Sequence, residues 1–182
     1  MSHKSPLLER QDCLLVVIDV QEKLMRVMSD KDKVAENVLK LVQFAKIVGL
    51  PLVFTEQEKL GPTLPGIYAE APGAPVIGKI SFDCLASPEF AKKLQELGRR
   101  TLLLCGVESH ICVAQTALSA LEHYRVQVIS DAISSRSLHN WVIAVERLRA
   151  AGAVITSTEM VMYELLRQAG SEEFRATLPL VK

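Results

Sequence analysis

The sequence lacks an excess of charge of either sign and any apolar run long enough to cross a membrane. Its 182 residues include 21 basic and 21 acidic side chains, so the formal net charge is zero. A balanced charge offers no electrostatic attraction to nucleic acid or to an anionic membrane surface. The apolar run from Leu14 to Ile18 stops at the carboxylate of Asp19, well short of the roughly 20 residues that a membrane helix needs. We therefore expect a small-molecule substrate as the partner, with no nucleic acid and no membrane.

Cysteine is scarce as well, and its spacing is irregular. The four cysteines, Cys13, Cys84, Cys105 and Cys112, include no CxxC pair, which argues against a disulfide framework and against a zinc knuckle. The first dozen residues contain no apolar core of a secretory signal. These features predict reduced thiols and a cytoplasmic location. A chain with reduced thiols can use one of them as a nucleophile.

Apolar runs of strand length alternate with segments of helical periodicity, which predicts repeated βα units and a mainly parallel sheet. We expect a three-layer, doubly wound α/β fold with six strands in the order 3-2-1-4-5-6 and helices on both faces. The chain, 1–182, is interpreted as a single domain with peripheral tails at 1–11 and 171–182. The predicted strands are Cys13 to Asp19, Leu52 to Glu56, Val76 to Gly78, Thr101 to Gly106, Val126 to Ser130 and Val154 to Ser157.

Three polar residues stand at the carboxyl ends of predicted strands, where open parallel sheets bind their ligands. Asp19 ends the first strand, Lys79 directly follows the third, and Cys112 begins the helix after the fourth. The positive end of a helix dipole favours a thiolate, so we expect a lowered pKa for Cys112. Asp19 can accept the thiol proton, and Lys79 can complete the site.

The segments LLVVIDVQEKL, GKISFDC, LLLCGVESHICVAQTALSAL and ISDAISSRS together resemble the isochorismatase-like cysteine hydrolases. The resemblance covers residues 13 to 166 and is nearest to the subgroup of isochorismatase-domain-containing proteins. It implies a parallel sheet covered by helices on both faces, and it places the family's catalytic triad on Asp19, Lys79 and Cys112. We also expect a homo-oligomer, either a dimer or a tetramer.

The same resemblance implies a cis peptide bond between Val107 and Glu108. In the family, such a bond turns the backbone N–H of the second residue toward the same point as the backbone N–H of the nucleophile. An oxyanion hole formed by the backbone N–H groups of Glu108 and Cys112 is therefore expected.

One segment departs from the nicotinamidases of this superfamily, which hold a metal with an Asp-x-His pair and a further histidine after the second strand. The corresponding residues here, Thr55 to Pro65, include no histidine. We therefore expect no metal and no other cofactor. The favoured function is a metal-independent cysteine hydrolase that cleaves a small amide, ureide or carbamoyl C–N bond through a thioester.

Two other functions stay open for the same fold. One is a vinyl-ether hydrolase of the isochorismate type, which needs no cysteine nucleophile. The other is a catalytically idle or redox-sensing interaction protein, in which Cys112 forms a disulfide with Cys84. The three triad residues argue against an idle protein.

Four further residues are candidates for lining a substrate pocket: Leu24, Tyr68, Phe82 and His110. Ordinary packing explains the three apolar and aromatic residues equally well, and His110 also fits a loop or an interface. The long irregular stretch from Gln57 to Pro75 is of the kind that forms lids and binding loops.

Overall fold

Six parallel strands form one sheet in the order β3-β2-β1-β4-β5-β6, which confirms the predicted doubly wound α/β fold. The structure is a computed structural model that describes residues 7–182. Residues 1–6 of the predicted N-terminal tail lie outside the described residues. The strands are β1 (Cys13–Ile18), β2 (Leu52–Gln57), β3 (Val76–Lys79), β4 (Thr101–Val107), β5 (Arg125–Ser134) and β6 (Val154–Thr156).

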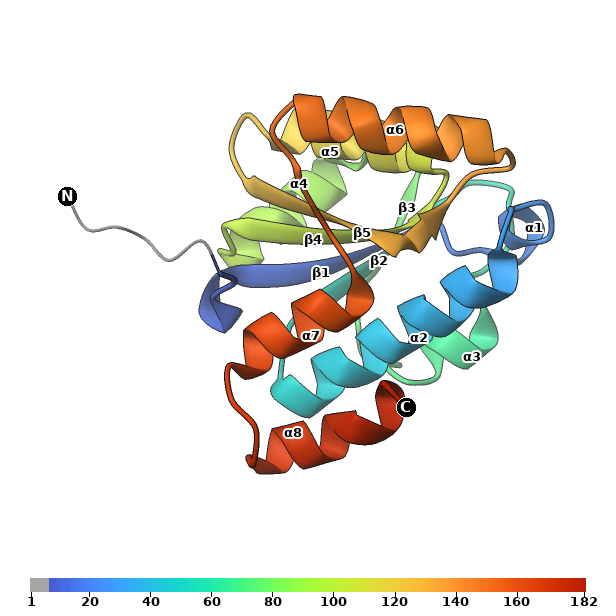
Figure 1. Ribbon diagram of the computed structural model, residues 1–182. Coiled ribbons are helices and arrows are strands. Elements are labelled where there is room, and N and C mark those ends of the chain that lie inside the picture. Colours follow the sequence, from blue (N-terminus) through green and yellow to red (C-terminus); the bar gives the residue numbers. More distant parts are fainter. Residues whose placement is uncertain (1–6) are drawn as a thin grey trace.

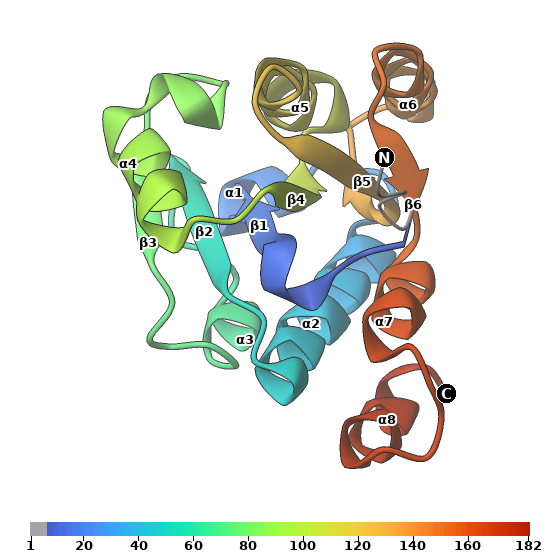
Figure 2. The same ribbon diagram turned by 90° about the vertical axis from the view of Figure 1, so that its left-hand side faces the viewer.

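Helices cover both faces of the sheet, as Figure 1 shows from the side and Figure 2 from one end. One face carries α2 (Lys31–Val48), α7 (Thr158–Leu166) and α8 (Glu172–Thr177). The other face carries α4 (Pro88–Leu97), α5 (Ala114–Ala120) and α6 (Leu138–Ala150). Two short helices, α1 (Glu22–Met25) and α3 (Pro65–Tyr68), lie in the connections after β1 and β2.

The alternation of side chains along β1 divides the core between these two faces. The odd-numbered residues from Cys13 to Val17 belong to the cluster packed beneath α2 and α7. The even-numbered residues from Leu14 to Ile18 belong to the cluster packed beneath α4 and α5. Because both faces of the strand are covered, its sequence is a continuous apolar run.

Strand β5 is longer than the sequence predicts, since it continues past Ser130 to Ser134. Its pairing with β4 shifts register between Leu104 and Gly106, so that Val107 lies opposite Ser134. The polar residues Ser130 and Asp131 suggested a strand end. Instead, the side chain of Asp131 accepts a hydrogen bond at 2.8 Å from a backbone N–H at the start of α7, so the strand continues through them.

Strands β1 and β4 approach each other closely at the point where the strand order reverses. Gly106 has a φ of +114°, and a Cβ atom there would lie 2.0 Å from the carbonyl oxygen of Ile18. Only glycine fits this conformation and this contact. This close approach places the end of β1, which is followed by Asp19, beside the end of β4, which leads to Cys112.

The C-terminal residues, expected to be peripheral, form α8 and a 3-10 turn (Leu178–Leu180). Phe174 packs against the core cluster beneath α2. Glu173 accepts two hydrogen bonds from the guanidinium of Arg10, at 2.8 and 2.6 Å. This segment is therefore packed against the rest of the fold.

Candidate active site

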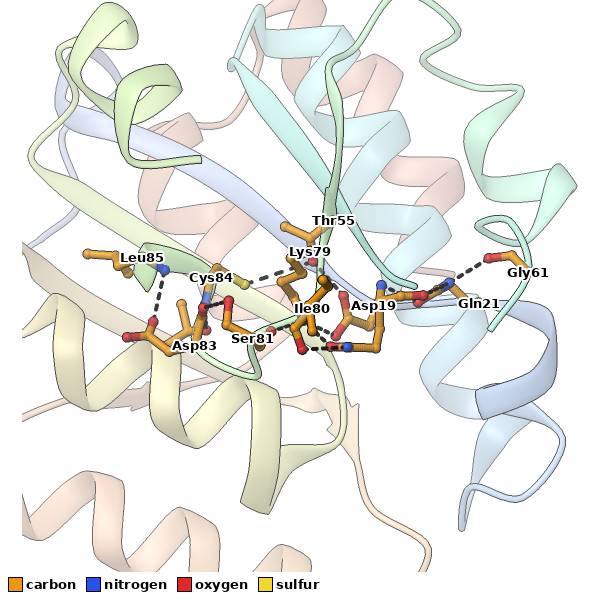
Figure 3. A network of polar contacts seen from close by, with 12 residues as sticks. Asp19, Gln21, Thr55, Gly61, Lys79, Ile80, Ser81, Asp83, Cys84 and Leu85 are labelled. Atoms are coloured by element: carbon orange, nitrogen blue, oxygen red, sulfur yellow. Dashed lines mark hydrogen bonds and ion pairs between the residues drawn. The ribbon is translucent and has the colours of Figure 1, made fainter. Parts of the chain in front are cut away.

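The centre of the site is a buried ion pair at the carboxyl ends of β1 and β3 (Figure 3). Nζ of Lys79 lies 2.6 Å from Oδ2 of Asp19, and the two side chains are 1% and 0% exposed. Asp19 follows the last residue of β1 and has a φ of +52°, in the left-handed region. Lys79 is the last residue of β3, one residue beyond the predicted strand. The structure thus brings together two of the residues predicted for the triad.

Strand β2 supplies two side chains that sequence reasoning missed. Oγ1 of Thr55 donates a hydrogen bond to Oδ1 of Asp19 at 2.7 Å. Nζ of Lys79 donates to Oε1 of Gln57 at 3.0 Å and to the carbonyl oxygen of Ser81 at 3.2 Å. With the bond to Asp19, all three N–H groups of the ammonium have acceptors. Thr55 and Gln57 follow the apolar part of a buried strand, and that placement was the signal available in the sequence.

Gln21 holds this strand end in place. Its side chain is fully buried, and its Oε1 accepts a hydrogen bond from the backbone N–H of Gln57 at 2.8 Å. Its Nε2 donates to the carbonyl oxygens of Gln57 and Gly61. The segment after β1 is therefore linked to the end of β2, and Gln57 is held beside Lys79.

Cys112 lies in a π-helical turn (Ser109–Val113) that leads into α5, and this turn is called the nucleophile turn below. The thiol is 6% exposed. Burial raises its pKa to about 12, aided by the charge of Asp19 and a hydrogen bond to it, while Lys79 acts in the opposite direction. The predicted lowering of the pKa is therefore wrong, because burial and the carboxylate outweigh the helix dipole. Cys112 is a thiol at neutral pH and needs a base to react.

The peptide bond between Val107 and Glu108 is cis, as the resemblance implied. Glu108 precedes the nucleophile turn, and its carbonyl oxygen accepts hydrogen bonds from the backbone N–H groups of Ile111 and Val113 at 3.0 and 3.2 Å. The main chain of Glu108 is therefore held against the turn that carries Cys112.

The residues predicted to line a pocket are placed in different surroundings. Leu24 and Tyr68 pack against the core cluster beneath α2, whereas Cys112 belongs to the cluster on the other face of the sheet. Phe82 is 51% exposed and lies three residues after Lys79. His110 lies in the nucleophile turn, where Nδ1 is 2.9 Å from Oγ of a buried serine, Ser135. Of the four, only Phe82 and His110 lie close to a triad residue in the sequence: Phe82 is three residues after Lys79, and His110 is two residues before Cys112.

Cys84 is a fourth buried group beside Asp19 and Lys79. Its thiol donates to Oγ1 of Thr55 at 3.9 Å, and its backbone N–H donates to Oγ1 of Thr116 at 3.0 Å. Burial raises its pKa to about 12. All four cysteines lie in the described part of the chain, and none of them forms a disulfide there.

Within residues 7–182, no group of three or more His, Cys, Asp or Glu side chains is arranged to hold a metal ion. The same residues include no helix with the length and apolar character needed to span a bilayer. The site is built from the thiol of Cys112, the carboxylate of Asp19 and the ammonium of Lys79.

The model of the Isochorismatase domain matches residues 13–160, a range that contains Asp19, Lys79 and Cys112. The chain belongs to the isochorismatase family. It is similar to the secreted isochorismatase effector Isc1 from Phytophthora sojae, with 37% identity over 93% of this chain and 84% of the relative. Family membership supports a hydrolase in general terms.

Several solved structures superimpose on nearly all of the chain. MAR1 ribonuclease from Caenorhabditis elegans has a TM-score of 0.90 and 28% identity, covering 96% of this chain and 92% of its own. YcaC from Pseudomonas aeruginosa, solved with hexane-2,5-diol and covalent acrylamide, has a TM-score of 0.91 and 29% identity, covering 98% and 93%. The YcaC gene product from Escherichia coli, an octameric hydrolase of unknown specificity, has a TM-score of 0.88 and 28% identity, covering 99% and 89%.

Proposed function

We propose that this isochorismatase-family chain is a metal-independent cysteine hydrolase that cleaves a small amide, ureide or carbamoyl C–N bond through a thioester. The observation that carries this proposal is the buried Asp19–Lys79 ion pair beside the Cys112 thiol. A fully buried carboxylate whose charge acts on a neighbouring thiol is in place to remove its proton. The Pseudomonas relative was solved with covalent acrylamide, so that protein has a group that reacts with an electrophile.

The donors around Asp19 indicate which of its oxygens carries the proton. Lys79 donates to Oδ2, and an ammonium has no acceptor, so a proton on Oδ2 would face another donor. Oδ1 accepts from Thr55, whose hydroxyl can also act as an acceptor. Oδ1 is therefore the oxygen that receives the proton of Cys112.

Each step of the proposed reaction uses the same groups. Asp19 removes the thiol proton as Sγ of Cys112 bonds to the carbonyl carbon, and the carbonyl π electrons move to the oxygen. The backbone N–H groups of Glu108 and Cys112 stabilise this oxyanion. The C–N bond then breaks, and Asp19 returns the proton to the leaving amine. Asp19 then removes a proton from water as the water oxygen attacks the thioester carbon. The C–S bond breaks, the acid is released, and Asp19 returns this proton to the thiolate of Cys112.

The raised pKa of Cys112 is consistent with this use of Asp19. A thiol with a pKa of about 12 has very little thiolate at neutral pH. Its protonated state resists oxidation and unspecific alkylation between turnovers. The proton passes from Cys112 to Asp19 only as the sulfur attacks the carbonyl carbon of a bound substrate.

The test is a panel of small primary amides, ureides and carbamoyl compounds, with isochorismate and RNA as competing substrates. We expect hydrolysis of a C–N bond, and we expect Cys112→Ala and Asp19→Ala both to abolish it. Cleavage of isochorismate that survives in Cys112→Ala but not in Asp19→Ala favours the vinyl-ether hydrolase instead. Hydrolysis of RNA alone, the activity named for the Caenorhabditis relative, contradicts the proposal.

Metal independence has its own measurement. We expect the hydrolase activity to persist after treatment with EDTA and gel filtration. A loss of activity that zinc or iron restores contradicts the proposal.

We further propose a homo-oligomer, a dimer or a tetramer, in the cytoplasm. The octameric Escherichia coli relative supports oligomerisation but has a larger number of subunits. Sedimentation velocity measures the state directly, and a monomer at micromolar concentration contradicts it. The Phytophthora relative is named as secreted, so fractionation of the source cells tests the location of this chain.

A further inference from the structure

The nucleophile turn is linked to the loop between β5 and α6 by the side chain of Glu108. Its Oε2 accepts hydrogen bonds from the backbone N–H and from Nε of Arg136, both at 3.1 Å. The side chain of Glu108 is 7% exposed, whereas that of Arg136 is 60% exposed. Val107 lies opposite Ser134 in the sheet, so the ends of β4 and β5 are adjacent and the two side chains meet.

The main chain of Glu108 is therefore held from two sides. Its carboxylate is held by Arg136, and its carbonyl oxygen accepts from the N–H groups of Ile111 and Val113. A second link joins the same two segments, since Nδ1 of His110 lies 2.9 Å from Oγ of Ser135. These contacts fix the orientation of the peptide groups on each side of Glu108.

Charge gives the Glu108–Arg136 contact a further effect. The carboxylate of Glu108 belongs to the same residue as one proposed donor of the oxyanion hole. A buried carboxylate without a cation near that hole would repel the negative charge that develops on the substrate oxygen, and the repulsion is strong where water is excluded. Arg136 supplies the compensating positive charge.

We infer that Arg136 is a positioning residue for the oxyanion hole, because it holds the Glu108 carboxylate and neutralises its charge. The inference rests on the proposed function, in which the N–H groups of Glu108 and Cys112 form that hole. Arg136 acts through Glu108 and is not required to touch the substrate.

Propionaldehyde is a suitable probe because a thiol adds to it reversibly. Sγ of Cys112 bonds to the aldehyde carbon, the π electrons move to the oxygen, and the thiol proton passes to Asp19; no group leaves. The product places an oxyanion where the tetrahedral intermediate would place it. Iodoacetamide instead reacts by displacement of iodide at a saturated carbon, with no charge developing on a carbonyl oxygen. Protection of Cys112 by propionaldehyde against iodoacetamide thus measures both reactions in one experiment.

In Arg136→Ala, we expect the affinity for propionaldehyde to fall at least about tenfold more than the rate of iodoacetamide labelling falls, as expected for an impaired oxyanion donor. Arg125→Ala is the matched control, since it removes an arginine–carboxylate pair of 2.9 Å with Asp12 at the other end of β5. Arg125→Ala is expected to change neither the affinity for propionaldehyde nor the rate of iodoacetamide labelling. A purely structural role of Arg136 would lower both quantities together, and equal changes overturn the inference.

A second comparison avoids leaving a buried charge that could prevent folding. We expect Glu108→Gln/Arg136→Ala to bind propionaldehyde more tightly than Arg136→Ala, because the uncompensated charge is gone, and less tightly than Glu108→Gln alone. If the double variant and Glu108→Gln bind equally, Arg136 has no positioning role. If the wild-type protein shows no aldehyde protection of Cys112, the proposed oxyanion hole is wrong and the inference fails with it.

Discussion

Cys112 keeps its proton at neutral pH because burial and the carboxylate of Asp19 both oppose a thiolate. The charge of Lys79 lowers the pKa of Cys112. However, the three N–H groups of Lys79 donate to Asp19, Gln57 and Ser81. The reactivity of the thiol therefore depends on transfer of its proton to Asp19. It does not depend on a standing population of thiolate.

This dependence predicts the pH profile of Cys112 labelling by iodoacetamide. An unassisted thiol with a pKa of about 12 reacts about tenfold faster for each pH unit in the neutral range. With Asp19 as the base, we expect the rate to stay within about threefold between pH 6 and pH 8. In Asp19→Asn the rate should rise with pH, because the proton then leaves to solvent. Mass spectrometry of the Cys112 peptide measures the rate.

Asp131→Asn provides the control for that experiment. Asp131 also accepts a hydrogen bond from a threonine hydroxyl, that of Thr158, at 3.0 Å. It lies in β5 and, unlike Asp19, is not among the groups that shift the pKa of Cys112. The Asp131→Asn variant should leave the pH profile of Cys112 labelling by iodoacetamide flat. A tenfold rise per pH unit in the wild-type protein would show that Asp19 does not act as the base.

At the scale of elements, the site depends on the contact between β1 and β4. The six residue pairs from Cys13–Thr101 to Ile18–Gly106 are in register, and at the last pair a Cβ atom on Gly106 would clash with the carbonyl oxygen of Ile18. Asp19 directly follows Ile18, and the nucleophile turn begins three residues after Gly106. Any change in the separation of the two strands therefore moves the base relative to the thiol.

Gly106→Ala tests that contact. A Cβ atom would lie 2.0 Å from the carbonyl oxygen of Ile18, and the φ of +114° is unfavourable for alanine. We expect the free energy of unfolding in urea to fall by more than about 3 kcal/mol. Gly78→Ala in β3 is the matched control, since no atom lies within 4 Å of its Cβ position. Equal stability of the two variants would contradict the close approach.

The comparison of sequence and structure is also clearest for individual elements. The apolar runs predicted the six strands, because strands covered on both faces are continuously apolar. The order 3-2-1-4-5-6 was expected from the doubly wound fold, and the structure confirms it. The extension of β5 to Ser134 was missed, since polar residues at 130 and 131 make tertiary contacts that no local pattern contains. The cis bond at Glu108 followed only from family resemblance.

The candidate site was predictable to a similar extent. Topology placed Asp19 and Lys79 correctly at strand ends, because carboxyl ends of parallel strands share one edge. The pKa of Cys112 was predicted in the wrong direction, because local sequence reveals the helix but not the depth of burial. Thr55 and Gln57 were missed because their roles depend on partners in other strands.

At the scale of the whole molecule, buried thiols lie in both halves of the core. Cys13 and Cys105 belong to the cluster beneath α2, and Cys84 and Cys112 belong to the cluster beneath α4 and α5. Burial raises the pKa of each thiol above its ordinary value of 9.0. The unfolded chain therefore loses these protons at lower pH than the folded one.

This difference predicts a loss of stability at alkaline pH. The raised folded-state pKa values mean that the contribution is complete below pH 9 and is lost between pH 9 and pH 12. Each thiol should lower the free energy of unfolding by about 1.4 kcal/mol per pH unit in that window. Urea unfolding between pH 9 and pH 11 measures the slope. Cys105→Ala should reduce it, and an unchanged slope would contradict the contribution of this thiol.

The three hydrogen bonds of Lys79 also bear on how the acylated protein survives. A thioester beside a primary amine can pass its acyl group to nitrogen and leave a permanent amide, which would end turnover. Burial lowers the pKa of Lys79, but the charge of Asp19 and its hydrogen bond act in the opposite direction, and the pKa is raised overall. The nitrogen has no lone pair in the ammonium state, and each of its protons is held by an oxygen of the chain. The side chain nearest to the base is thereby prevented from competing with water for the acyl group.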